Sequence, residues 1–138
     1  MGLNILFAAF AAWFLAQALK VIITLFRDKK FDLKRFVESG GMPSSHTALV
    51  IGLSTSIAKY EGLHSTYFAI AIIFSLVVMY DAAGVRRAAG RQAAILNKII
   101  QDIYQHKYTG KSLKELLGHT PKEVLAGAIL GVAIGLLL

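Results

Sequence analysis

The sequence predicts an all-α integral membrane protein, a helical bundle of about four transmembrane helices plus an amphipathic helix. Of its 138 residues, 56% are hydrophobic and only 17% are charged, whereas soluble domains are roughly 45–50% apolar and about 25% charged. The apolar residues are concentrated in long runs, as they are in membrane spans. A chain of this length forms one domain, so we expect a single membrane-embedded domain over residues 1–138.

Four stretches are the expected spans, and two of them are stronger than the others. Residues 3–26 and 65–85 are almost uninterrupted apolar sequence, and the first lacks the basic start and cleavage site of a signal peptide. Residues 44–59 are shorter and more polar, and residues 124–138 reach only about 23 Å as a helix. In this last stretch Gly127, Gly131 and Gly135 recur every four residues, which predicts a smooth ridge for close helix packing.

An amphipathic helix is expected between the third and fourth spans. Its apolar positions recur at helical spacing in Leu96, Ile99, Ile100 and Ile103. Such a helix either lies on the membrane or continues the third span past the membrane surface. A polar turn region follows at residues 107–114.

The distribution of basic residues predicts the orientation. Cytoplasmic loops are enriched in lysine and arginine, and the two long loops carry nearly all of them, namely Arg27, Lys29, Lys30, Lys34 and Arg35, then Arg86, Arg87, Arg91, Lys98, Lys107, Lys111 and Lys114. The short loop between spans two and three offers only Lys59. Both termini are therefore expected outside, and the inner ends of four segments would bring two histidines and several cations to the cytoplasmic face.

Composition narrows the partners. The net charge of +7 comes from basic residues that lie beside apolar runs, which favours anionic lipid head groups or a phosphate substrate over nucleic acid. The absence of cysteine excludes disulfides and thiolate metal sites. No cluster of acidic ligands is present to bind a metal, so we expect neither a metal nor another cofactor.

The first polar segment of interest is Gly40-Gly41-Met42-Pro43-Ser44-Ser45-His46-Thr47. A helix that starts at the serines would offer free N–H groups and hydroxyls to an anion, and His46 in its first turn could exchange a proton. The alternative is an ordinary N-cap followed by a histidine at a helix end. Both interpretations remain open from the spacing alone.

The second segment is Gly118-His119-Thr120-Pro121-Lys122-Glu123. Thr120 and Glu123 match a capping box, with Pro121 at the favoured first helical position. A carboxylate four residues after His119 can also approach its ring and orient it as in a catalytic triad. Glu123 could therefore serve as cap, as orienter, or as both.

The third segment contains Asp81 and three arginines. Arg87 and Arg91 share a helical face, while Arg86 points about 100° away. Guanidinium groups bind phosphate oxygens in a bidentate fork, although anchoring to anionic lipid explains such arginines equally well. Asp81 at the span end is expected to pair with one of them, and His64 and His106 are expected to be solvated.

Three spacings in the chain resemble a known set of motifs. Lys20 and Arg27 are separated by six residues, Pro43-Ser44-Ser45-His46 is contiguous, and His119 and Glu123 are separated by three residues. In these features the chain resembles the type 2 phosphatidic acid phosphatase superfamily, and within it the small divergent bacterial and plant branch of acid phosphatase/vanadium-dependent haloperoxidase-related membrane proteins. The stretch 80–97 is similar to that branch's own signature.

The resemblance implies a phosphatase-like domain and a role for each matching residue. His119 would attack phosphorus and become phosphohistidine, Glu123 would orient it, and His46 would protonate the leaving oxygen. The phosphate would be held by Lys20, Arg27, Ser44 and Ser45. No metal would be needed.

The chain also departs from the superfamily's motifs. Asp28 replaces a proline, Ser45 a glycine and Glu123 an aspartate, and the arginine of the third motif falls on Leu113. We therefore expect Arg86, Arg87 or Arg91 to supply that charge. The chain has fewer spans than typical members, so a homodimer could complete the bundle.

The resulting hypothesis is a metal-independent phosphatase that acts on a lipid phosphate monoester at the cytoplasmic face of the cell membrane. Phosphatidate, phosphatidylglycerophosphate and isoprenyl phosphates are not distinguished. The alternative is a non-catalytic membrane protein that binds or transports a phospholipid or anion at the same cationic site. Vanadate-dependent halide oxidation is disfavoured, because the chain lacks a soluble scaffold.

Overall fold

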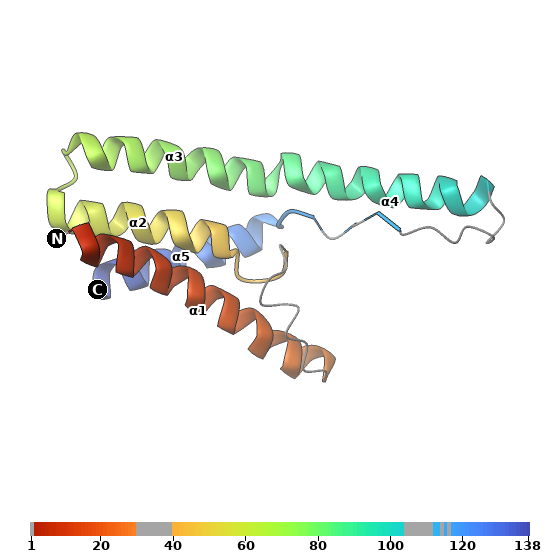
Figure 1. Cartoon of the computed structure of the whole chain (residues 1–138), viewed down its shortest axis with the longest axis horizontal. Coiled ribbons are helices and arrows are strands. Elements are labelled where there is room, and N and C mark those ends of the chain that lie inside the picture. The colour runs from red at the N-terminus through yellow and green to blue at the C-terminus, as the bar shows by residue number, and fades with distance from the viewer. Residues whose placement is uncertain (1, 30–39, 104–111, 114, 116) are drawn as a thin grey trace.

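The computed structural model describes residues 2–29, 40–103, 112–113, 115 and 117–138, without the side chains of residues 27 and 28. Within these ranges the chain forms five helices and no strand: α1 (Gly2–Asp28), α2 (Ser45–Glu61), α3 (Thr66–Ala83), α4 (Val85–Ile103) and α5 (Pro121–Leu137). Figure 1 shows α2 beside α1, α3 and α5, with α4 prolonging α3 into a long rod. The predicted polar turn at residues 107–114 and His106 lie largely or wholly outside the described residues.

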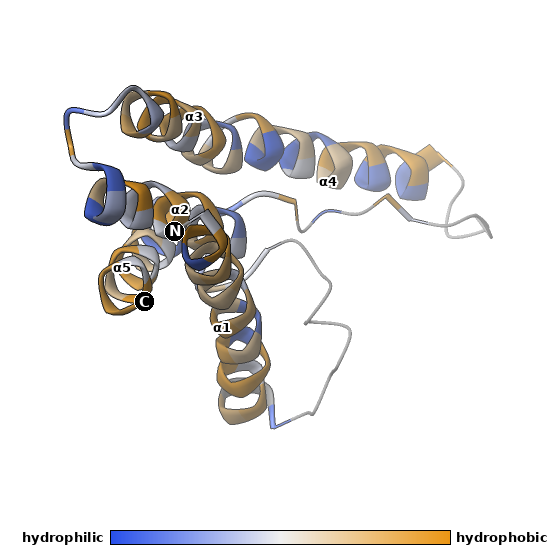
Figure 2. Ribbon diagram, turned by 60° about the vertical axis from the view of Figure 1, so that its left-hand side comes forward, coloured by the Kyte–Doolittle hydropathy of each residue, from blue (hydrophilic) through white to orange (hydrophobic). Residues whose placement is uncertain are grey.

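The chain is a membrane helical bundle, as the sequence predicts. Two described segments, Gly2–Phe26 and Thr66–Ile103, are long and apolar enough to cross a membrane. Large apolar side chains of α1, α3 and α5, such as Phe10, Ile73 and Ile129, are exposed on its outside, where lipid would cover them. Figure 2 shows these helices as mostly hydrophobic ribbons. The weaker second and fourth spans correspond to α2 and α5, which have 17 residues each.

The inside of the bundle is built from small residues. Ala12 and Ala16 of α1 and Ala48 of α2 are fully buried and form the core cluster. A methyl group added to Gly52 of α2 would lie only 3.0 Å from the Ala12 Cβ. Since lipid is as apolar as the core, helices in a membrane associate through such close backbone approach rather than through a hydrophobic effect.

The predicted glycine ridge of α5 is confirmed, and its partner is α2. Gly127, Gly131 and Gly135 are all buried. A Cβ on Gly131 would meet the Ala48 carbonyl oxygen at 2.8 Å and the Gly52 nitrogen at 2.9 Å, which are backbone atoms that cannot move aside easily. The helices α2 and α5 are therefore in backbone contact along their length.

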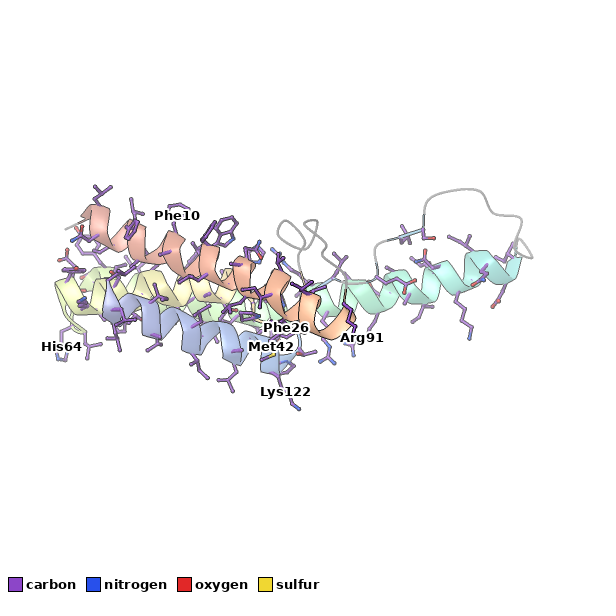
Figure 3. The ribbon with its side chains drawn as sticks, turned by 90° about the horizontal axis from the view of Figure 1, so that it is seen from below. Phe10, Phe26, Met42, His64, Arg91 and Lys122 are labelled. Atoms are coloured by element: carbon purple, nitrogen blue, oxygen red, sulfur yellow. The ribbon has the colours of Figure 1, made fainter. Side chains whose placement is uncertain are left out.

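Hydrogen bonds at the two ends of the bundle fix the direction of the helices. Away from the histidines, the Tyr60 hydroxyl donates to the Leu138 carbonyl (2.7 Å) and the Lys59 Nζ donates to the Leu136 carbonyl (3.0 Å). At the opposite end, the Ser44 N–H donates to the Glu123 carbonyl (2.9 Å). Figure 3 shows His64 at the first end, and Met42 and Lys122 at the second. His64 is exposed, as expected.

The amphipathic helix continues the third span, so the second of its two expected arrangements is found. Only Gly84 separates α3 from α4, and the two are nearly collinear (Figure 1). The side chain of Asn97 holds the returning chain against α4, because it accepts from the Leu113 N–H (2.8 Å) and donates to the Leu113 carbonyl (2.9 Å).

Candidate functional site

His119 is held at the end of the bundle by its backbone on one side and by its ring on the other. Its N–H donates to the Ala82 carbonyl at the end of α3 (2.9 Å). The preceding Gly118 has φ +82° and lies against the backbone of Arg87, so any side chain at position 118 would clash. The tight turn at Gly118 therefore places His119 inside the end of the bundle, and only 3% of the His119 surface is exposed.

The two nitrogens of the His119 ring have different surroundings. Nδ1 lies 3.3 Å from Oε2 of Glu123, whereas Nε2 is buried and has no hydrogen-bond partner among the described residues. If the carboxylate takes the Nδ1–H, the lone pair of Nε2 is free. Leaving a buried nitrogen without a hydrogen-bond partner lowers the stability of the fold. The arrangement is therefore suited to a ring whose Nε2 binds an electrophile or a hydrogen-bond donor.

The carboxylate of Glu123 contacts both groups that the sequence singled out, the start of α5 and the His119 ring. Its Oε2 accepts the Thr120 N–H (2.9 Å), while the Glu123 N–H donates to the Thr120 hydroxyl (3.4 Å), which completes the predicted capping box. The same oxygen faces His119. The first turn of α5 therefore fixes the carboxylate, and the carboxylate fixes the imidazole.

The serines at the start of α2 have structural partners. Ser44 is the N-cap, and its hydroxyl oxygen accepts from the N–H (3.4 Å) and hydroxyl (2.9 Å) of Thr47. Ser45 accepts from the Lys20 Nζ (3.2 Å). Both serines are almost completely buried. In this structure their hydroxyls stabilise the helix start and the lysine, so the expected direct phosphate contact would require them to change partners.

His46 and His119 line the same cavity, although they are 73 positions apart in the chain. The cavity has a volume of about 360 Å³ and lies between α2 and α3. His46 is half-buried in the first turn of α2, where the backbone N–H groups of a helix lack intrahelical acceptors and attract anions. Arg86, His119, Lys20 and Asp81 all interact electrostatically with its ring.

Of the three candidate arginines, Arg86 lines this cavity. Its Nε donates to Oδ2 of Asp81 (2.7 Å), which confirms the expected ion pair at the end of the third span. Arg87 and Arg91 are exposed and are not among the described residues around the cavity. Because Asp81 engages Nε, the terminal nitrogens of the Arg86 fork can face another acceptor.

Two further cations were expected at this end. Lys20 of α1 is 3% exposed and donates to Ser45 at the start of α2; its charge acts on both His46 and His119. Arg27 belongs to the last turn of α1, but its side chain lies outside the described part of the structure. The two cations thus come from different elements, Lys20 from α1 and Arg86 from the start of α4.

Burial lowers the pKa of His119 below its ordinary value, and the positive charge of Lys20 lowers it further. The hydrogen bond and negative charge of Glu123 raise this pKa, as does the backbone of Gly41. The net shift of the pKa is downward, which favours the neutral ring that a nucleophile or a hydrogen-bond acceptor needs. Within the described ranges, no group of three or more His, Asp or Glu residues is placed to hold a metal ion.

Two features of the site were not predicted from the sequence: Asp81 as a cavity residue, and the apolar walls of the cavity. Asp81 was expected only as a partner for an arginine, yet it lines the cavity beside the two histidines. In the sequence, the apolar residues that form the cavity walls cannot be distinguished from ordinary residues of a membrane span. Only the packing of α3 against α2 distinguishes them from the residues that face lipid.

Comparisons with known proteins identify a family and a relative for this chain. The family described as "Divergent PAP2 family" matches residues 2–134. The chain is also 41% identical over 145 aligned positions to the "Uncharacterized membrane protein YuiD" of Bacillus subtilis (strain 168), covering 96% of this chain and 92% of the relative. No solved structure matches the chain.

Proposed function

We propose that this chain, which belongs to the divergent PAP2 family, is a phosphatase that hydrolyses a lipid phosphate monoester through a phosphohistidine at the membrane interface. One observation carries the proposal. His119 lines a cavity together with His46 and Arg86; its Nε2 is buried without a hydrogen-bond partner among the described residues, and its Nδ1 faces a carboxylate. A nucleophile, an orienting acid, a proton donor and a cation are the groups that phosphoryl transfer requires.

In the first step, Nε2 of His119 attacks phosphorus and forms an N–P bond as the P–O bond to the lipid alcohol breaks. His46, in its protonated form, gives a proton to the departing oxygen, so the lipid leaves as a neutral alcohol. The imidazole gains positive charge when it attacks, and Glu123 stabilises that charge through Nδ1–H.

In the second step, water attacks the phosphorus of phosphohistidine. His46, now neutral, takes a proton from this water, the N–P bond breaks, and inorganic phosphate leaves. Both imidazoles then have their initial protonation states, so the cycle is balanced without another reactant. His46 acts first as acid and then as base, which is why it must lie on the opposite side of the phosphorus from His119.

Arg86 and Lys20 would stabilise the phosphate oxygens from two sides. We assign to Arg86 the role of the third-motif arginine, because Leu113 occupies that sequence position and is bound by Asn97 on α4. Arg86→Met is expected to lower kcat/KM at least about tenfold, the effect of losing a charge-assisted hydrogen bond. Lys122→Met, which removes an exposed cation from the same end of the bundle, should leave kcat/KM within about twofold. Equal effects of the two changes would contradict a specific role for Arg86.

The site is expected to face the cytoplasm. The positive-inside rule favours that side for the ends of α1, α3 and α4, which carry most of the lysine and arginine residues. A substrate head group in the inner leaflet would then meet His119 at the level of the lipid phosphates.

The proposal is tested by incubating the purified protein, with chelator present, with phosphatidate, phosphatidylglycerophosphate and isoprenyl phosphates. Release of inorganic phosphate from at least one of them, lost in His119→Ala with an unchanged thermal unfolding temperature, is the expected result. An acid-labile phosphoryl group on His119, trapped by rapid quenching, would identify the intermediate. Binding of lipid phosphates without any release would favour the alternative, a protein that binds or moves anionic lipids.

A further inference from the structure

The cavity that holds the two histidines has a second, apolar part. Below the polar end its walls are Leu49 and Val50 of α2 and Phe74, Val77 and Val78 of α3; we refer to these five residues as the apolar groove. All the polar side chains of the cavity lie at one end, and none lies among these five. The cavity is therefore amphipathic along its length.

The apolar groove runs parallel to the helices, from the site into the bundle. Asp81 at the polar end and Phe74 at the far end are seven residues apart on α3, which corresponds to about 10 Å along a helix. On α2, His46 and Val50 are one turn apart. A molecule with its phosphate at His119 and its tail in this groove would point in the direction that lipid chains take.

The groove can be entered sideways from the bilayer. Phe74 and Val77 are 55% and 60% exposed although they line the cavity. Among the described helices, α3 packs on α2, α4 and α5 but not on α1. The seam between α2 and α3 is thus uncovered on one side, so a lipid need not leave the membrane to reach the site.

We infer that the apolar groove binds one hydrocarbon chain of the lipid phosphate, and specifically the segment nearest the phosphate. This inference rests on the proposed function and adds a determinant of substrate choice. The occupant follows first from the continuity of the groove with the cationic end of the cavity. It follows also from the size of the whole cavity, because about 360 Å³ is near the lower limit of roughly 300–1,000 Å³ for ligand pockets. One chain fits, and a second chain would stay in the bilayer.

A chain-length series tests the groove directly. The substrates are n-alkyl monophosphates from ethyl to decyl, each in solution as monomers, with phosphate release as the readout. Each methylene that enters the groove from water should raise kcat/KM, by at most about fourfold for complete burial. The increase should end once the chain spans the roughly 10 Å between the levels of Asp81 and Phe74.

A matched pair of variants on α3 links this series to the groove. Val78→Phe fills the groove, so kcat/KM should become nearly independent of chain length. Ile73→Phe adds the same ring to an exposed position of α3 that does not line the cavity, and should keep the native dependence. A native enzyme without chain-length dependence, or an Ile73→Phe variant that loses it, would overturn the inference.

A photolabelling experiment separates this inference from the proposed function. Decyl phosphate with a diazirine a few carbons from the phosphate is irradiated with the native protein, and the labelled residues are identified by mass spectrometry. Labels on the α2–α3 seam around Leu49 and Val77 support the groove even if no substrate is hydrolysed. Labels mainly on α1 or α5 refute the groove even if phosphate is released.

Discussion

Glu123→Gln is the substitution that best separates a catalytic carboxylate from a helix cap. In the structure one oxygen, Oε2, faces both the Thr120 N–H at 2.9 Å and Nδ1 of His119 at 3.3 Å. Glutamine keeps an oxygen for Thr120, since Gln is also found in capping boxes. It removes only the negative charge that His119 uses when its ring becomes positive.

The expected size of the effect follows from that geometry. A hydrogen bond to a charged group contributes about 1.5–3 kcal/mol, or roughly 10- to 150-fold in rate. The side chain of Glu123 is 22% exposed and the contact is 3.3 Å long, so we expect the lower part of this range, about 10- to 50-fold in kcat. The acidic limb of the pH profile should also move to lower pH, because Glu123 raises the pKa of His119 and its loss lowers that pKa.

The assay measures kcat and kcat/KM for phosphate release between about pH 4 and 8, with one substrate throughout so that ionisation of the substrate is constant. Thr120→Ala is the control, since it removes the cap hydroxyl and should cost about 0.5–2 kcal/mol of stability. The acidic limb of the pH profile of Thr120→Ala should not move. If Glu123→Gln leaves kcat within twofold and the limb in place, Glu123 is only a cap and the orienting role is wrong.

Three other predictions use different parts of the structure. Lys20→Met should move the acidic limb to higher pH, opposite to the Glu123 change, because the lysine charge lowers the pKa of His119; an unmoved limb would contradict that coupling. Gly127→Ala and Gly135→Ala should each lower the unfolding temperature in detergent by overpacking. Only Gly127→Ala should also lower kcat. Equal kcat values in the two variants would refute the link between Gly127 and the site. A reporter fused after Leu138 should be extracytoplasmic, and a cytoplasmic reporter would overturn the orientation.

Much of the fold could be predicted because a membrane restricts the alternatives. A long apolar run must be a helix, so residues 3–26 and 65–85 anticipated α1 and α3 within a few residues of their observed ends. The start of α5 was equally specified, because Thr120, Pro121 and Glu123 satisfy a capping box with local contacts alone. Local signals and apolar length therefore account for where the helices begin and end.

The rotation of the helices about their axes could not be predicted in the same way. The sequence shows that Arg86 and Arg87 point about 100° apart, but not which of them faces the histidines. That choice depends on the backbone of Arg87 lying against Gly118, a contact between distant parts of the chain. The apolar groove was missed for the same reason, since Val77 and Ile73 look alike until α2 is placed beside α3.

The glycine ridge connects the stability of the bundle to its site. Gly127 has no room for a Cβ because the Ser44 carbonyl lies against it, and one turn earlier the Glu123 carbonyl accepts the Ser44 N–H. The start of α2, with His46, is thus held against the first turn of α5, next to His119. Gly135 makes the same kind of contact with Gly52 and Thr55 at the far end, where no site residue lies. A methyl group at either glycine separates the helices, but only at Gly127 does the separation also move the two imidazoles apart.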